Sequence, residues 1–302
     1  MTLNGIGIDI VENNRIKKLI KNKKFLDNYI IEELKKINSE VDNKIIDRRT
    51  TINLSDISKL EVNLEEFQEI EKMTVVLLND GSLKSFKDHL DEKKLHSSIK
   101  NIYLSKQILS NQKILLFVSS GRVFTIDPNI LPSGKSNSKN FIFFVESSSN
   151  EKVISFIPFN KDKKCIVASK FGKGFIADLD DIVTSQRKGK QLFNLKNGDQ
   201  LISVTDHVNS HIACVSSNSK LLIFKTSDLP LLKKGGGVQL QKMNKENYLS
   251  DIQTFEKTEG IFWTKGSKII NEKNIDFWIG KRSQSGKKIP KKFNKNLKFN
   301  NA

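Results

Sequence analysis

The chain has 302 residues, of which 51 are Lys or Arg and 34 are Asp or Glu, so its formal net charge is +17 at pH 7. A positive excess of this size is typical of proteins that bind polyanions, with nucleic acid first and an anionic membrane surface second. No apolar run reaches the ~20 residues that a membrane-spanning helix needs, so the sequence predicts no membrane span. The only cysteines, Cys165 and Cys214, lie in apolar segments, and we expect them to be buried free thiols of a cytoplasmic protein.

The first 70 residues differ in pattern from the rest. Residues 1–30 begin with a β-type run, LNGIGIDIVE, and continue with apolar residues at helical spacing. Residues 31–46 continue the helical pattern, with Glu32 and Glu33 about one turn before Lys35 and Lys36. Residues 47–70 are mostly polar and are expected to be a linker.

Residues 71–280 contain five strand–turn–strand units. Their turn residues lie 40, 51, 47 and 47 positions apart, at Gly81, Gly121, Gly172, Ser219 and Gly266. A period of this size with two or more strands in each unit predicts an all-β, propeller-like array. Glycine at the turn supplies the positive φ that a tight hairpin needs.

Basic, Gly- or Ser-rich links join successive units: SGKSNSK at 133–139, TSQRKGKQ at 184–191 and KKGGGVQLQK at 233–242. Equivalent links of a propeller lie on one rim, so they predict a positive arc that follows a bent phosphate backbone. The alternative is a set of solvated loops. The predicted nucleic-acid ligands are these link residues and the first residues of two strands: Lys135, Lys139, Arg187, Lys188, Lys190, Lys233, Lys234, Arg122 and Lys220.

Residues 281–302 carry eight Lys or Arg and no acid, and we predict a disordered or loosely docked basic tail. Gly134-Lys135-Ser136 lacks the first glycine of a phosphate-binding loop, and no helical pattern follows it. His207 and His211 are expected to be surface loop residues without a metal shell. The sequence therefore predicts no catalytic residue and no cofactor for this chain.

Three segments carry a resemblance: LLFVSSGRVFTIDPNILP, TSQRKGKQLFNLKNGDQLISV and LLIFKTSDLPLLKKGGGVQLQKM. They resemble the C-terminal domain of the A subunits of type IIA DNA topoisomerases, and IIEELKKINSEVDNKIIDRRTTI resembles the helix that precedes that domain. Five units favour the topoisomerase IV type over the gyrase type. The resemblance implies a five-bladed β-pinwheel, a propeller variant whose strands cross between blades.

Family membership would also imply function. The domain would bind and bend double-stranded DNA in support of strand passage, decatenation and supercoil relaxation. The full enzyme, by resemblance, contains the B subunit of the topoisomerase as well as a second A subunit, and it uses Mg²⁺ and ATP. The domain with the DNA-cleaving tyrosine is absent from this chain, so we expect DNA binding without cleavage.

The segment GIGIDIVENNRIKKL resembles the N-terminus of holo-[acyl-carrier-protein] synthase, which transfers phosphopantetheine from coenzyme A. In that family the aspartate matching Asp9 binds Mg²⁺. The resemblance ends near Tyr29, and the later helix that supplies a second ligand is missing. A lone carboxylate does not hold Mg²⁺ firmly. A phosphopantetheinyl transferase fragment and a propeller scaffold that binds proteins remain alternatives.

Overall fold

The computed structural model describes residues 16–40, 70–134, 136–148, 150–206, 208–244, 246–266 and 268–299. The chain divides into one unit of residues 1–64 and a second of residues 65–302. Asp9, Lys135, His207 and the linker predicted at residues 47–70, except for its last residue, lie outside the described residues. Among the described residues, no helix is both long enough and apolar enough to cross a membrane.

The described part of the first unit is helical. Residues 16–21 form a helix, and α2 follows at Lys23–Glu40. Asn22 separates the two, and the N–H of Phe25 donates both to its side-chain oxygen at 3.3 Å and to its carbonyl at 3.1 Å, so Asn22 caps the start of α2. The domain boundary predicted at residue 30 falls inside α2, and it stays a prediction.

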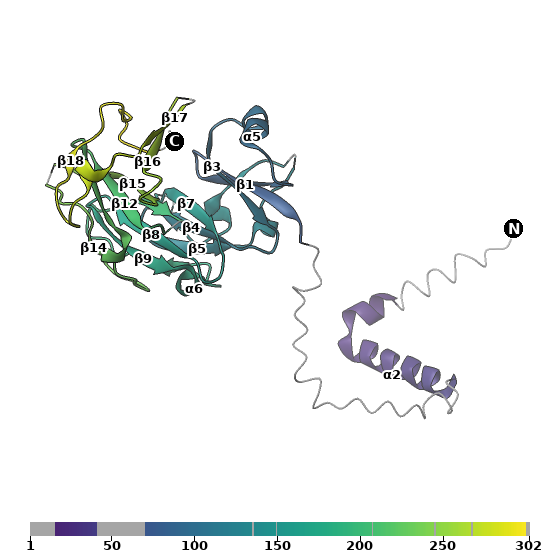
Figure 1. Ribbon diagram of the computed structural model, residues 1–302. Helices are drawn as coiled ribbons and strands as arrows, with labels where there is room; N and C mark the ends of the chain where they lie inside the picture. The colour runs from purple at the N-terminus through teal and green to yellow at the C-terminus, as the bar shows by residue number, and fades with distance from the viewer. Residues whose placement is uncertain are drawn as a thin grey trace, which may run out of the picture. The chain divides into compact units, whose positions relative to one another are not determined.

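The second unit is a succession of antiparallel sheets, which we call blades 1 to 5 (Figure 1). Blade 1 has the strand order β3 (Ile102–Leu109), β1 (Lys72–Leu78), β2 (Ser82–Lys87), β6 (Lys139–Asn140). Blade 2 has the order β10 (Lys190–Gln191), β5 (Arg122–Ile126), β4 (Ile114–Val118), β7 (Val153–Pro158). Blade 3 has the order β11 (Leu201–Thr205), β8 (Lys164–Ser169), β9 (Lys173–Asp178), β14 (Val238–Gln239).

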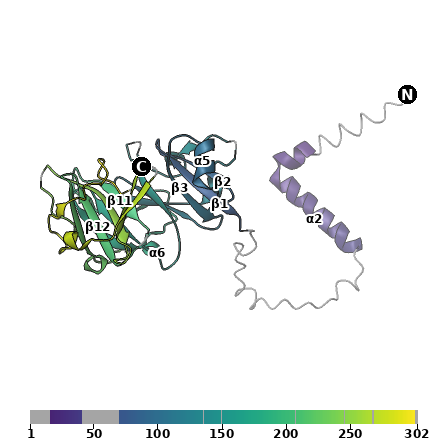
Figure 2. The same cartoon turned by 45° about the horizontal axis from the view of Figure 1, so that its top comes forward.

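The remaining sheets complete the series, and Figure 2 shows the same succession after rotation. Blade 4 has the order β15 (Leu249–Phe255), β12 (His211–Ser216), β13 (Lys220–Lys225), β18 (Lys287–Lys288). Blade 5 is the hairpin β16 (Ile261–Lys265) and β17 (Lys268–Glu272). Short helical segments connect strands: α5 (Glu92–Ser98), η2 (Pro128–Ile130), η3 (Phe141–Phe143), α6 (Leu179–Ile182), η4 (Thr226–Asp228) and η5 (Asp276–Trp278).

Strands are exchanged between blades. Each four-stranded blade is built on a hairpin, and we call the two strands of that hairpin, in chain order, the first and second strands of the blade. The third strand follows later in the chain and pairs with the first. The fourth strand, which pairs with the hairpin's second strand, comes from the link that follows the next blade's hairpin. Blade 1, for example, receives β6 from beyond the hairpin of blade 2. This exchange is the β-pinwheel arrangement that the resemblance implied.

Each pair of neighbouring blades shares one hydrophobic core. The first core joins Val75 and Leu77 of blade 1 to Leu116 and Phe124 of blade 2, and three further cores follow between the later blades. Central strands are therefore covered on both faces, and all five residues of β4 are buried. This explains why these strands read as continuous apolar runs rather than as alternating ones.

The predicted basic tail at residues 281–302 is wrong for the described residues 281–299. β18 pairs with β13 in blade 4, and Phe293 and Phe299 are buried in the core that blades 4 and 5 share. The two aromatic rings pack edge to face, with their centroids 5.3 Å apart. Two buried phenylalanines outweigh the local charge excess that suggested disorder, because each removes a large apolar area from water.

Both cysteine side chains lie in these cores, as predicted. Cys165 begins the buried part of β8, Cys214 lies in β12, and both thiols are free and buried. Burial raises the pKa of each thiol, and Asp206 and Asp251 add to the effect at Cys165 and Cys214 respectively. Since the thiolate is the reactive form, we expect an aromatic disulfide reagent at pH 8 to label neither thiol in the native protein and both in denaturant. Rapid labelling of the native state would contradict this placement.

Candidate nucleic-acid interface

The turns of blades 1 to 3 are closed by the same side-chain contact. The second residue of each fourth strand is an amide, and its NH₂ group donates to the carbonyl of the residue before the turn glycine. These bonds are Asn140 to Asp80 at 2.9 Å, Gln191 to Ser120 at 3.0 Å and Gln239 to Phe171 at 3.0 Å. The backbone N–H of the residue that follows the amide donates to the carbonyl of the turn glycine, as from Leu192 to Gly121 at 3.1 Å. Each fourth strand is thereby fixed against its hairpin.

Basic residues recur at the first position of the fourth strands. Lys139, Lys190 and Lys287 occupy this position and are exposed, whereas blade 3 has Val238 there. A second basic row begins the second strands of blades 2 to 5, and its members are Arg122, Lys173, Lys220 and Lys268. The third strands of successive blades contact one another, which places them at the hub. The fourth strands and their lysines therefore lie at the outer rim.

The link before β10 is held by several contacts. Arg122 Nη1 donates to the carbonyl of Lys188 at 3.0 Å, and the N–H of Thr184 donates to Thr125 Oγ1 at 3.1 Å. The carbonyl of Arg187 accepts the N–H of Glu146 at 2.9 Å. The side chains of Arg187 and Lys188 remain exposed. Two predicted site residues thus project from a positioned loop, and Arg122 is one of the groups that position it.

The link before β14 differs from the prediction in part. Lys233 pairs with Asp181 of α6 at 2.9 Å, and this hydrogen bond holds the pKa of Lys233 above its usual range. Lys234 is exposed. The backbone N–H of Gly235 donates to the carbonyl of Leu192 at 3.1 Å, and its carbonyl accepts the N–H of Asn194 at 2.8 Å. Lys234 is therefore the freer of the two lysines in this link.

Sequence reasoning missed three rim residues. Lys173 lies between Gly172 and Gly174, outside the three basic links, and Lys287 and Lys288 fall in the segment predicted to be a tail. Lys288 lies directly opposite Lys220 across β18 and β13. Like charges at such a position destabilise a sheet pair, so this arrangement favours an anionic partner. The signal was present in the similarity of GKKI at 286–289 to GKQL at 189–192.

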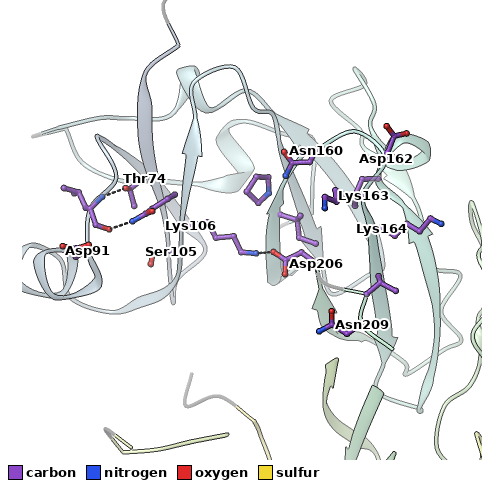
Figure 3. Close-up of a pocket in the computed structure, with 16 residues that line it drawn as sticks. Thr74, Asp91, Ser105, Lys106, Asn160, Asp162, Lys163, Lys164, Asp206 and Asn209 are labelled. Carbon is purple, nitrogen blue, oxygen red and sulfur yellow. Dashed lines mark hydrogen bonds and ion pairs between the residues drawn. The ribbon is translucent and has the colours of Figure 1, made fainter. Parts of the chain in front are cut away.

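A cavity of about 970 Å³ lies near the hub (Figure 3). Lys106 of blade 1 and Asp206 after β11 of blade 3 point toward one another there and form an ion pair. Lys163 and Lys164 line the same cavity, together with Asp91 and Asp162. Because its charges are mixed, this cavity offers less attraction for a polyanion than the rim. Within the described ranges, no cluster of three His, Cys, Asp or Glu residues is placed to hold a metal ion.

His211 was expected on a surface loop, and that expectation is wrong. It begins β12 and is 9% exposed, with its ring 6.0 Å from that of Phe255. Burial lowers the pKa of His211, and Lys257 and Lys225 lower it further. The imidazole therefore packs beside Phe255 in blade 4 rather than lying in a surface loop.

Comparisons with known proteins identify this architecture. A family model described as the DNA gyrase C-terminal domain, beta-propeller, matches residues 163–205 and 210–255. The A subunit of DNA topoisomerase 4 from Rickettsia bellii is 30% identical over 291 residues, covering 94% of this chain and 39% of that protein. The E. coli ParC C-terminal domain superposes with a TM-score of 0.63, at 22% identity, over 74% of this chain and 95% of that domain. The chain carries a C-terminal domain of the gyrase A and topoisomerase IV A type.

The topoisomerase relatives are longer than this chain. The A subunit of DNA topoisomerase 4 from E. coli is 29% identical over 174 residues, which cover 55% of this chain and 23% of that protein. The chain spans about two fifths of the length of the Rickettsia relatives. Its described blades correspond to the C-terminal domain in this family, and the β-pinwheel fold predicted from the sequence is confirmed.

Proposed function

We propose that the outer rim of blades 1 to 4 binds double-stranded DNA and bends it around the disc. The observation that carries this proposal is the recurrence of exposed basic residues at equivalent rim positions, at Lys139, Lys190 and Lys287. Phosphate contacts from such residues give affinity without base recognition. A curved row of them favours bent DNA because bending brings more phosphates into reach.

Within an assembled topoisomerase, we propose that this domain presents DNA to the cleavage machinery of the enzyme. Its partners would be the B subunit of the topoisomerase as well as a second A subunit, with Mg²⁺ and ATP used by the assembled enzyme in strand passage, decatenation and relaxation. The protein would act in the cytoplasm at the nucleoid. This proposal rests on the similarity to these relatives, which are named as A subunits of DNA topoisomerase 4 and extend well beyond the matched region.

The salt dependence of duplex binding tests the rim. Each phosphate contact contributes about −0.9 to the slope of log K against log salt concentration. If Lys139, Arg187, Lys188, Lys190, Lys287 and Lys288 all contact phosphates, the slope is about −5. Fluorescence anisotropy with two labelled duplexes of different sequence should give the same slope. A flat salt response, or no binding at 50 mM salt, would contradict the proposal.

A further inference from the structure

In the part of the chain that the structure describes, blade 5 lacks the fourth strand that the other blades have. In blades 1 to 4 the second strand pairs with a fourth strand along its outer edge. Within the described ranges, β17 pairs with β16 alone. The outer edge of β17 therefore corresponds to the edge that pairs with a fourth strand in each of blades 1 to 4.

β17 exposes an apolar side chain beside this edge. Ile270 lies opposite Trp263 and packs against the core that blades 4 and 5 share, whereas its neighbour Ile269, opposite Thr264, is 73% exposed. The turn is open as well: a Cβ added at Gly121 would lie 2.6 Å from the carbonyl oxygen of Phe193, whereas one added at Gly266 would meet nothing within 4 Å.

The inner edge of the same hairpin is closed by the chain itself. The side-chain amide of Gln253 accepts the N–H of Phe262 at 3.0 Å and donates to its carbonyl at 2.7 Å. The N–H of Thr264 donates to the carbonyl of Phe299 at 2.9 Å. The open edge of the hairpin is thus the outer one, which receives a strand in every other blade.

The fold explains why blade 1 does not supply this strand. The segments that deliver fourth strands run from the second to the third strand of a blade, as at 127–152 in blade 2 and 179–200 in blade 3. The corresponding segment of blade 1 is shorter, at 88–101, and contains α5. Leu95 of α5 is buried, and the N–H of Leu90 donates to Thr74 Oγ1 at 2.9 Å, so this segment is committed to blade 1.

We propose that the outer edge of β17 binds an extended segment of another protein by strand addition. Main-chain hydrogen bonds to an exposed edge supply the affinity in this mode, and side-chain pockets supply the selectivity. The four internal fourth strands define the preferred segment, because each has Lys or Val, then Asn, Gln or Lys, and is followed by Phe, Leu or Ile. Lys265 and Lys268 are exposed on the hairpin, so we expect an acidic residue at the first position of the bound segment.

The occupant is a different chain rather than a second copy. The four segments with this pattern in the described part of the chain are already paired in their own blades. DNA is a less suitable occupant of this edge, because a charged phosphate backbone would not bury the apolar side chain of Ile269. Strand addition at β17 does not depend on DNA binding at the rim, so the two proposals fail separately.

The test uses the full chain and a labelled peptide with the sequence of residues 186–195, in which Glu replaces the residue matching Lys190. A control peptide has Pro at the position matching Leu192, which removes the N–H that a turn carbonyl accepts in blade 2. We expect the first peptide to bind with a Kd below about 1 mM, an affinity in the range of weak peptide recognition. The Pro peptide should bind at least tenfold more weakly.

Two variants locate the site. Ile269→Asp should weaken peptide binding at least tenfold, whereas Phe143→Asp, at a residue that is 72% exposed in η3, should leave it unchanged. Absence of peptide binding, or equal binding of the Pro peptide, would overturn the proposal. So would a wild-type dimer in sedimentation that Ile269→Asp dissociates, since it would make a second copy the occupant. A loss of DNA affinity in Ile269→Asp would assign the edge to DNA instead.

Discussion

Reversing three charges in the link before β10 is expected to abolish most DNA affinity. In the triple variant Arg187→Glu, Lys188→Glu, Lys190→Glu, the exposed side chains of one positioned loop change sign. Each lost phosphate contact lowers the salt slope by about 1, so the slope should fall in magnitude by about 3. Repulsion adds to this loss, and the affinity at 100 mM salt should fall by roughly two orders of magnitude. Fluorescence anisotropy on a duplex long enough to follow the rim measures both quantities.

A matched control separates position from total charge. Lys161, Lys163 and Lys164 are exposed, and the last two line the hub cavity rather than the rim. Their reversal to Glu makes the same change in net charge. We expect this variant to lose less than about tenfold in affinity, through the long-range field alone. Equal losses in both triple variants would mean that net charge, and not the rim, governs binding. Thermal unfolding of both variants checks that the fold is intact.

The blades could be predicted from the sequence because their turns carry a local signal. Gly81, Gly121, Gly172 and Gly266 all have positive φ, between 61° and 81°, and Ser219 adopts the same region at 59°. This conformation is costly for most residues and free for glycine, so glycine at a regular period marks the hairpins. The buried free thiols followed in the same way from apolar strand patterns.

The exchanged strands could not be predicted in the same way. Each fourth strand has two residues, too few to show any alternation of polar and apolar side chains. Its pairing is decided by a hairpin far away in the chain, as for Lys190 opposite Val123 of β5 or Lys287 opposite Leu221 of β13. Residues 281–299 were therefore misassigned, and the rim lysines at 287 and 288 were missed.

The rim residues themselves were partly predictable. The basic links identified Lys139, Lys190 and Arg187 because charge density is a local property of sequence. Which of the basic groups remain free depends on partners far along the chain, such as Asp181 for Lys233 and the carbonyl of Lys188 for Arg122. The sequence alone does not distinguish these basic residues from one another. The structure shows which of their side chains are exposed and which hold the links through contacts within the protein.

Removing the ring of Phe193 is expected to produce the largest loss of stability. Phe193 follows β10 and packs edge to face on Phe175 of blade 3, with centroids 5.0 Å apart and both side chains at most 1% exposed. Phe193→Ala leaves a cavity between blades 2 and 3 and should lower the free energy of unfolding by about 3–5 kcal/mol. Phe143→Ala makes the same change at an exposed side chain and should cost less than about 0.5 kcal/mol. Urea denaturation of both variants gives the comparison.

Phe193→Ala also tests what holds the link around β10 in place, the packing of the Phe193 ring or the hydrogen bonds of the link. The N–H of Phe193 donates to the carbonyl of Gly121 at 2.9 Å, and its own carbonyl accepts from Gln191 at 2.7 Å. Alanine keeps both bonds, so the folded fraction of Phe193→Ala should keep its rim lysines in place and bind DNA within about twofold of wild type. A loss of DNA affinity at a temperature where the variant is fully folded would mean that the interblade ring contact, rather than the turn hydrogen bonds, positions the link. An unfolding free energy reduced by less than about 1 kcal/mol would contradict the shared core between blades, because a well-packed site cannot lose a phenyl ring so cheaply.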